Sequence, residues 1–333
     1  MNFMNNYFVC IILSFLLTLL SIPLVKKLAF ISGFVDRPNP NNPGKIHKKE
    51  TALLGGLAVL LGVIPSTFIL KNFTIETITI VLLTIFMFLI GLQDDKKNLD
   101  YRIRLIAEFI TASIFAIVVL KLNTFSSIFS IFGFVIAIFW VIGIINAVNM
   151  MDNIDGATAG VTSIATIAIL TIAIYQGNHL PGVLSSALLG SALAFLIFNY
   201  SPASIFLGDA GTLSIGFLLA STTAIEFKES IHSFSPEVLA FPFVLGFPIY
   251  DTTFATIRRI ALKKPIYVGG GSNITYRLIS SKIDKQKVVF IEYGLQAFFC
   301  IVALCMLWGN IYIYSIAIIF GIAIPLIIGR RLF

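Results

Sequence analysis

Long apolar runs alternate with short polar segments along the whole chain. The first run covers residues 7–25, and ten more follow at 52–70, 77–93, 105–122, 125–147, 157–175, 182–200, 212–227, 237–257, 288–308 and 311–328. A helix that crosses a membrane needs about 20 consecutive, predominantly apolar residues, within a range of about 17–25. The pattern therefore predicts an all-α, polytopic integral membrane protein, a helical bundle with 10–11 transmembrane helices.

Basic residues are divided unequally between the two sides that this pattern defines. The first apolar run has no basic residue before it and is followed by Lys26 and Lys27, which is the reverse of a signal peptide. We therefore expect an uncleaved first helix with the N-terminus outside and the C-terminus in the cytoplasm. In this orientation 20 of the 23 lysines and arginines are inside, and only Lys71, Lys121 and Lys228 are outside. A bias of this kind in short loops sets the orientation of membrane proteins.

The composition narrows the class further. Of the 333 residues, 58% are hydrophobic and 12% are charged, whereas soluble domains have about 25% charged residues. Soluble, disordered and disulfide-stabilised secreted proteins are therefore excluded. We expect one transmembrane domain over residues 1–333, in the plasma membrane and without a nucleic-acid partner. The three cysteines lie in apolar runs, and the three histidines are far apart, without the spacing of zinc ligands.

Aspartates gather on the predicted inner side, at the ends of the apolar runs. They are Asp94, Asp95, Asp152, Asp155, Asp209 and Asp251. A charged residue in mid-bilayer costs about 2.5–3.5 kcal/mol on insertion scales, so these residues belong near water, a counter-charge or a metal. Oxygen ligands without a Cys or His cluster favour Mg²⁺, or alternatively Mn²⁺, over zinc. The pattern predicts a cytoplasm-facing, metal-dependent site for a phosphorylated substrate.

Each of these elements also has a simpler interpretation. An Asp-Asp pair in a loop is commonly just solvated, and Asp209 in FLGDAG could cap a helix after a tight turn. Asn146, Asn149, Asp152 and Asp155 recur every three residues, so two or three of them share one helix face, and capping plus a polar loop would account for them. These interpretations do not explain why so many aspartates stand directly against apolar spans.

The basic and glycine-rich segments on the inner side can be interpreted either as structural features or as phosphate-binding sites. The segment 258–287 fits a positive-inside loop, and the GGG run at 269–271 could be a hinge or a weak phosphate cradle. His47 and its neighbouring lysines could meet a diphosphate, although attraction to the anionic leaflet is the default.

Five inner segments, taken in chain order, resemble those of a known family. They read DRPNPNNPGKIH…LLGG, GLQDDKKNLDYRIRLIAE, NAVNMMDNIDG, NYSPASIFLGDAG and FPIYDTTFATIRR. Over residues 20–280 the chain is similar to the polyprenyl-phosphate N-acetylhexosamine-1-phosphate transferases, whose superfamily includes phospho-N-acetylmuramoyl-pentapeptide transferase. The resemblance implies ten or eleven spans, a requirement for Mg²⁺, and transfer of a sugar-1-phosphate from a UDP-sugar to a polyprenyl phosphate with release of UMP.

The resemblance also implies roles for individual residues. Asp94 and Asp95 match an adjacent aspartate pair implicated in metal binding and activation of the acceptor phosphate, and Asp209 matches the aspartate closest to the magnesium. These three are the predicted catalytic and metal-binding residues, and Asp94 or Asp95 could act as the base. The predicted substrate-binding residues are His47, Arg102, Arg104, Asn149, Asp152, Asp155, Asp251, Arg258, Asn273, Tyr276 and Arg277.

One segment departs from the family pattern. The last inner loop of the family usually carries a histidine cluster, whereas this chain reads VGGGSNITYRL there. Asn273 and Tyr276 stand where histidines are expected. Both can form hydrogen bonds with phosphate or sugar, but neither titrates near pH 7.

The expected function is therefore transfer of an N-acetylhexosamine-1-phosphate, with GlcNAc favoured, from a UDP-N-acetylhexosamine to undecaprenyl phosphate or a close relative. This step would start a lipid-linked glycan of the cell envelope. Three alternatives stay open: a weakly active or inactive relative, a transferase of the phospho-MurNAc-pentapeptide type, and a cation-coupled transporter. A homodimer is one option for the assembly. The transporter is disfavoured because its ion site would lie at mid-bilayer within an internal repeat.

Overall fold

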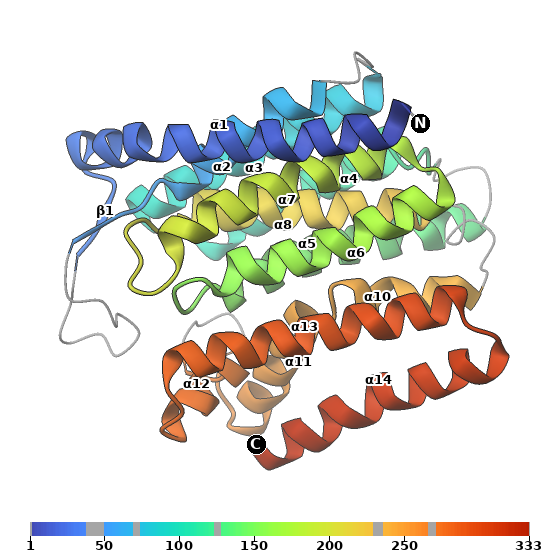
Figure 1. The fold of residues 1–333 in the computed structure, drawn as a ribbon. Coiled ribbons are helices and arrows are strands. Elements are labelled where there is room, and N and C mark those ends of the chain that lie inside the picture. The colour runs from blue at the N-terminus through green and yellow to red at the C-terminus, as the bar shows by residue number, and fades with distance from the viewer. Residues whose placement is uncertain are drawn as a thin grey trace.

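The computed structural model describes residues 2–37, 50–68, 74–122, 128–228, 236–265 and 271–332. Its long helices run side by side as a bundle, as Figure 1 shows. In chain order they are α1 (Asn2–Ser32), α2 (Gly55–Thr67), α3 (Ile75–Lys97), α4 (Tyr101–Val118), α5 (Ile128–Met151), α6 (Ala157–Gln176), α7 (His179–Asn199), α8 (Gly208–Glu226), η2 (Pro236–Ala240), α10 (Phe241–Val244), α11 (Gly246–Ala261), α12 (Ile274–Ser280), α13 (Lys285–Trp308) and α14 (Ile311–Leu332).

Each predicted apolar run coincides with one of these helices or, for residues 237–257, with the bent group η2, α10 and α11. Among the described residues, seven helices are long and apolar enough to cross a membrane, and the bent group would add an eighth. Three of the eleven predicted runs do not qualify: α2 has 13 residues, α4 carries Arg102, Arg104 and Glu108, and α8 contains two acidic and several small polar residues. The prediction of an all-α, polytopic membrane protein is confirmed, while the sides on which the termini lie stay a prediction.

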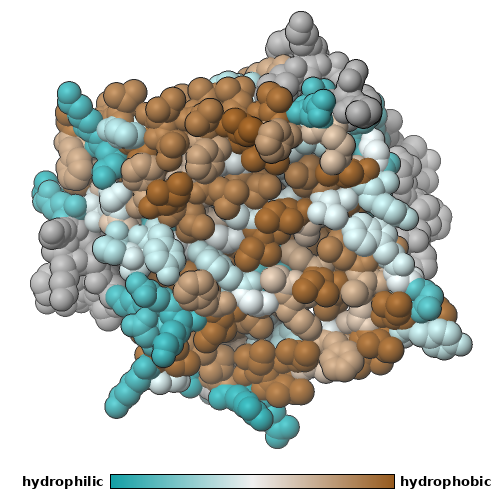
Figure 2. All heavy atoms as spheres, in the orientation of Figure 1, coloured by the Kyte–Doolittle hydropathy of each residue, from teal (hydrophilic) through white to brown (hydrophobic). Residues whose placement is uncertain are grey.

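The outside of the bundle is apolar, as lipid contact requires. Figure 2 shows hydrophobic side chains across one flank and hydrophilic ones gathered toward its ends. Large apolar side chains stay exposed, for example Leu24 at 72% and Phe139 at 74%. Soluble monomers rarely leave such continuous apolar surface in contact with water. The flank is therefore the surface that faces the acyl chains.

Helix α8 lies in the centre of the bundle, with α3, α5, α2 and α7 packed around it. Phe217 and Leu219 in its middle are fully buried. Small residues let the neighbouring backbones come close, since a Cβ at Gly56 would lie 2.3 Å from the Cα of Gly211. The first turn of α8, which carries Asp209, is thereby held at one end of the core.

A small antiparallel sheet fixes the chain beside this end. Strand β1 (Val35–Asp36) pairs with β2 (Thr51–Ala52), and the carbonyl of Ala52 accepts a hydrogen bond of 2.8 Å from the backbone N–H of Phe206. The sheet is therefore attached to the segment that leads into α8.

The axis of α11 is bent by 80° relative to the preceding helical segment, Val238–Val244. Its Asp251 and Arg259 are buried, whereas Ile257 and Ile260 are 55% and 63% exposed. This part of the chain contains Pro248 near the bend, and proline is favoured in the first turn of a new helix.

Candidate active site

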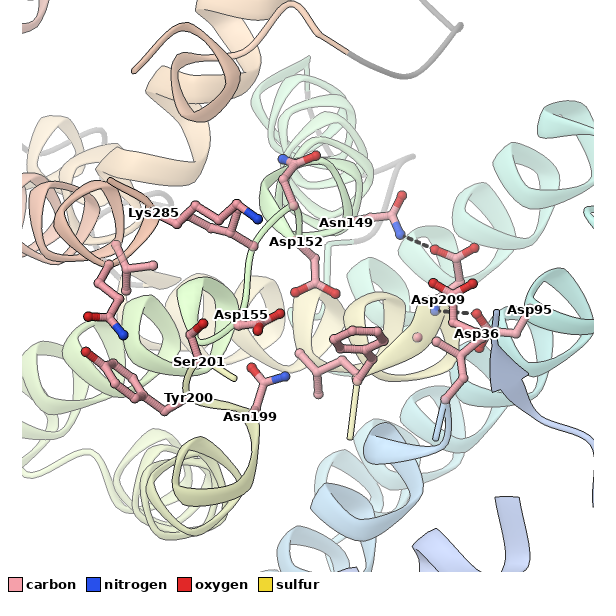
Figure 3. Close-up of a pocket in the computed structure, with 18 residues that line it drawn as sticks. Asp36, Asp95, Asn149, Asp152, Asp155, Asn199, Tyr200, Ser201, Asp209 and Lys285 are labelled. Atoms are coloured by element: carbon pink, nitrogen blue, oxygen red, sulfur yellow. Dashed lines mark hydrogen bonds between the residues drawn. The ribbon is translucent and has the colours of Figure 1, made fainter. Parts of the chain in front are cut away.

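The candidate active site is a cavity of about 300 Å³ at one end of the bundle. It lies between the N-terminus of α8, the segment after α5, the start of α13 and strand β1, and Figure 3 shows the side chains that line it. Five aspartates lie in its wall: Asp36, Asp95, Asp152, Asp155 and Asp209. A concave site that gathers ionisable groups from distant parts of a chain is the default candidate for function.

Asp95 at the end of α3 holds the N-terminus of α8. Its Oδ1 accepts a hydrogen bond of 2.8 Å from the backbone N–H of Asp209, and its Oδ2 accepts one of 3.0 Å from that of Ala210. The first N–H groups of a helix lack partners within the helix and favour negative charge. The turn before them requires Gly208, which has a φ of +71° and would place a Cβ 2.6 Å from Asp95 Oδ2. Asp95 thus fixes the position of Asp209.

Asp209 itself is oriented from α5. The side-chain amide of Asn149 donates to Oδ1 of Asp209 at 2.5 Å and to Oγ1 of Thr212 at 2.9 Å, and Figure 3 shows the first of these bonds. Asn149 and Asp209 are thereby brought together from two helices, as the predicted site requires.

The neighbouring Asp94 faces in another direction, toward α4. Its Oδ1 accepts a hydrogen bond of 2.7 Å from the backbone N–H of Leu99, and its Oδ2 accepts one of 3.1 Å from Nη1 of Arg104. Asp94 interacts electrostatically with Asp209, although it is not part of the cavity wall. The adjacent pair therefore splits, because one member caps α8 and the other pairs with Arg104.

The polar segment after α5 is tied to the segment before α8. Asp152 Oδ1 accepts from the hydroxyl of Thr158 at 2.7 Å, and Asp155 Oδ2 accepts from the backbone N–H of Ala203 at 3.0 Å. Asn199 joins the same two segments, because it accepts from the N–H of Gly156 at 3.0 Å. These bonds keep the carboxylates of Asp152 and Asp155 at the middle of the cavity, as Figure 3 shows.

The pKa of Asp152 reflects this crowded acidic setting. Burial raises it to about 6, and the charges of Asp209 and Asp155 raise it as well, while the bond from Thr158 opposes them. The pKa of Asp152 thus lies well above the ordinary range of an aspartate. An anionic ligand entering the cavity needs cations to offset this negative charge.

The donor atoms fit a hard divalent cation that is shared with a ligand. Among the described residues, no group of three or more Asp, Glu, His or Cys side chains is arranged as a closed metal cage. Magnesium usually takes one or two carboxylates and completes its shell with water and substrate phosphates, so it needs no such cage. Asp209, in the cavity wall, offers that kind of partial site. Metal binding by Asp94, Asp95 and Asp209 stays a prediction.

Of the predicted site residues, the cavity wall contains Asp95, Asn149, Asp152, Asp155 and Asp209. The others that the structure describes lie outside it: Asp94, Arg102, Arg104, Asp251, Arg258, Asn273, Tyr276 and Arg277. His47 falls outside the described residues, so its predicted role is not addressed by the structure. A role in substrate binding stays a prediction for all of them.

Several residues outside the cavity wall form structural bonds around α12. Asp251 Oδ1 accepts from the N–H of Ile274 at 2.8 Å, and Asn273 caps α12 by accepting from the N–H of Tyr276 at 3.3 Å. Nε of Arg277 donates to the carbonyl of Leu332 at 2.7 Å. Asp251, Asn273 and Arg277 thus help to hold α11, α12 and α14 together.

The sequence analysis did not single out the other lining residues, of which Asp36, Asn199 and Lys285 are the most relevant to the site. Asp36 and Asn199 lie within segments that carry the family resemblance, so the segments signalled them without singling them out. Lys285 had no such signal, because it was counted only among the positive charges of the last inner loop.

The chain is thus a membrane protein whose apolar helical bundle has an acidic, oxygen-rich cavity at one end. Residues 77–227 match the model of glycosyl transferase family 4. The chain is 31% identical to a probable undecaprenyl-phosphate N-acetylglucosaminyl 1-phosphate transferase of Bacillus subtilis, over 94% of this chain and 89% of that protein. The chain belongs to the polyprenyl-phosphate N-acetylhexosamine-1-phosphate transferase family.

Two further relatives show the breadth of the family. An undecaprenyl-phosphate alpha-N-acetylglucosaminyl 1-phosphate transferase of Thermotoga maritima is 28% identical, over 92% of this chain and 91% of that protein. A phospho-N-acetylmuramoyl-pentapeptide-transferase of a Geobacillus species is 32% identical, over 65% of this chain and 74% of that protein.

The close approach of α3 to the first turn of α8 leads to a testable prediction. A Cβ at Gly91 would lie 2.4 Å from the carbonyl oxygen of Asp209 and 2.5 Å from the Cα of Ala210, so Gly91→Ala must push α8 away from Asp95. We expect a lower melting temperature in detergent and a loss of any activity that depends on Asp209. Overpacking of this kind costs about 1–3 kcal/mol.

Gly143→Ala is the matched control, because a Cβ there meets nothing within 4 Å. It should leave both the melting temperature and activity close to those of the wild type. Equal behaviour of the two alanine variants would contradict the packing argument.

Proposed function

We propose that this protein transfers a sugar-1-phosphate, preferably N-acetylglucosamine-1-phosphate, from a UDP-sugar to undecaprenyl phosphate or a close relative and releases UMP. The observation that carries the proposal is the anchored carboxylate of Asp209, which Asp95 and Asn149 hold in the wall of an acidic cavity. Membership of the family and the names of two relatives that cover most of the chain support it.

The proposed reaction needs no nucleophile from the protein. An oxygen of the acceptor phosphate attacks the phosphorus of the sugar-linked phosphate, a new P–O bond forms, and the P–O bond to the UMP leaving group breaks. The barrier is mainly repulsion between two anions, so positioning and charge neutralisation are the tasks of the site. Bound Mg²⁺, or Mn²⁺ in its place, would supply positive charge at the diphosphate.

The residues of the chain take distinct roles in this proposal. Asp209 would bind the metal, with Asp94 beside it, and Asp95 would keep Asp209 in place. Asp94 could also accept the last proton of the acceptor phosphate, although the second pKa of a phosphate monoester is about 6 and leaves little need for a base. Asn149 would hold Asp209 in one orientation.

Lys285 is the residue most suited to offset the charge of the donor inside the cavity. It is half-buried at the start of α13 and is the only lysine or arginine among the lining residues that the structure describes. Its ammonium group has no hydrogen bond or ion pair within the described part of the chain, and Figure 3 shows its side chain among the residues that line the cavity. A charged donor that is not already paired is available to a ligand.

A second cavity offers a place for the lipid. It measures about 620 Å³, lies between α11, α13 and α14, and is lined by apolar side chains such as Phe254 and Leu326, with Arg330 at one end. An apolar groove with one cation is chemically complementary to a polyprenyl chain and its phosphate. The active site would then face the cytoplasm of a cell whose plasma membrane holds the protein.

The first test is an assay of the purified protein with polyprenyl phosphate, Mg²⁺ and a panel of UDP-sugars. We expect Mg²⁺-dependent UMP release that is fastest with UDP-N-acetylglucosamine. Preference for UDP-MurNAc-pentapeptide would instead place the chain with the pentapeptide branch. No UMP release with any UDP-N-acetylhexosamine would refute the proposed function and favour a relative without catalysis.

Asp209→Asn should abolish turnover and leave the melting temperature almost unchanged. The introduced amide can keep the contact to Asn149 through its oxygen but carries no charge for a metal. The measurement is UMP release per mole of folded protein at saturating Mg²⁺. Turnover close to that of the wild type would remove Asp209 from the metal site.

Lys285→Met should weaken donor binding by about 10-fold or more, since hydrogen bonds to charged groups contribute about 1.5–3 kcal/mol. The measurement is the KM for the UDP-sugar, with the KM for the lipid acceptor as an internal reference. Lys287→Met is the matched control, because Lys287 is exposed on the same helix and does not line the cavity. Equal donor KM values for the two variants would contradict the role of Lys285.

A further inference from the structure

A chain of polar contacts surrounds the candidate site on the side away from the cavity. It starts at Asp94, which accepts a hydrogen bond from Nη1 of Arg104 at 3.1 Å. Nε of Arg104 lies 3.7 Å from Oε1 of Glu108, one turn further along α4. Oε2 of Glu108 accepts a hydrogen bond of 2.5 Å from the side-chain amide of Asn146 on α5. One turn after Asn146 on α5 comes Asn149, which donates to Asp209.

The contacts therefore connect four helices. They run from Asp209 on α8 to Asn149 on α5, from Asn146 on α5 to Glu108 on α4, along α4 to Arg104, and from Arg104 to Asp94 on α3. Glu108 is the one glutamate in this chain of contacts, and it does not line the cavity. The sequence analysis did not single it out.

A carboxylate at the position of Glu108 is costly if it serves packing alone. Its side chain is 1% exposed, and its Oε1 has no hydrogen-bond partner among the described residues, with Arg104 at 3.7 Å as its charge partner. Replacing a buried charged pair by apolar residues is often neutral or stabilising. Packing alone would be served equally by apolar residues at both positions of the pair, so the retained charges point to a further role.

The geometry explains what the carboxylate does for Arg104. A guanidinium group is a rigid plane with five donors, and two anchors on different edges fix the orientation of that plane. Asp94 holds Nη1 from α3, and Glu108 attracts Nε from α4. Without the charge of Glu108, Arg104 would keep one anchor and could turn about it. Oδ1 of Asp94 would keep its bond from the N–H of Leu99, whereas Oδ2 would lose a partner of fixed direction.

We propose that Glu108 is a positioning residue of the transfer reaction, which acts on the Asp94 carboxylate solely through Arg104. This inference rests on the proposed function, because its effect is measured on the transfer step. It predicts that the charge of Glu108, and not only its volume or its bond to Asn146, determines the rate. An anchor that served stability alone would change the amount of folded protein and leave the rate per folded molecule unchanged.

The experiment is a double-mutant cycle with Glu108→Gln and Arg104→Ala. Glutamine keeps the volume and can still accept from Asn146, but it has no charge for Arg104. We expect kcat for Glu108→Gln to fall by about 10- to 100-fold, the cost of a small misplacement near the reacting groups. Both KM values should stay within about threefold, and the double variant should be no slower than Arg104→Ala.

Glu76→Gln is the matched control, because Glu76 pairs with Lys121 at 2.9 Å at the far end of α3. It should have the kcat of the wild type. If Glu108→Gln does not fold, Glu108→Asp, which keeps the charge, should retain more activity than any neutral replacement that folds. Unchanged kcat for Glu108→Gln, or additive effects with Arg104→Ala, would overturn the inference. Absence of UMP release from the wild type would instead refute the proposed function.

Discussion

The hydrogen bonds from the N-terminus of α8 to the carboxylate of Asp95 are the interaction on which the rest of the site depends. They join the end of α3 to the start of the central helix across more than one hundred residues of sequence. Charge on the carboxylate matches the partial positive charge of the helix terminus. The bonds also lie at the end of an apolar bundle, where unpaired N–H groups would be expensive to bury. The position of Asp209 is therefore a consequence of satisfying the helix terminus.

Close backbone packing makes this arrangement specific. Gly56, Gly91 and Gly208 each lie where a Cβ would meet α8 or Asp95 at 2.6 Å or less. Between apolar helices in lipid, association depends on packing and interhelical hydrogen bonds, since lipid is as apolar as the side chains. Small residues thus bring α2 and α3 near enough to α8 for the polar bonds to form. The close packing and the polar contacts both fix the first turn of α8.

The helical class and the central part of the site could be predicted from the sequence, for different reasons. Apolar runs of suitable length are a direct signal for helices in membranes, and each run coincides with a helix or a bent group. Asp95, Asn149, Asp152, Asp155 and Asp209 do line one cavity, because motifs at the ends of neighbouring helices meet at the same end of a bundle. Among the described residues, seven or eight helices meet the length and hydropathy of a span where ten or eleven were predicted, since α2 is short, α4 carries three charges and α8 is rich in small polar residues.

Other features could not be read from the sequence because they depend on distant contacts. That Asp95 caps a helix while its neighbour Asp94 pairs with Arg104 is decided by which side of α3 faces α8. Lys285 reaches the cavity only because α13 begins beside the segment after α5. Glu108 lies one turn beyond Arg104, at the end of a segment that carries the family resemblance, but its contact with Asn146 on α5 could not be read from that segment.

The 80° bend before α11 has a consequence for how a lipid acceptor would arrive. Because Ile257 and Ile260 stay exposed beside Arg258, this helix suits the boundary where acyl chains give way to water. A molecule with a long isoprenoid tail could then approach by lateral diffusion and present only its headgroup to the aqueous phase. Extracting such a tail from the bilayer would cost about 0.8 kcal/mol for each methylene, and a sideways entrance avoids that expense entirely.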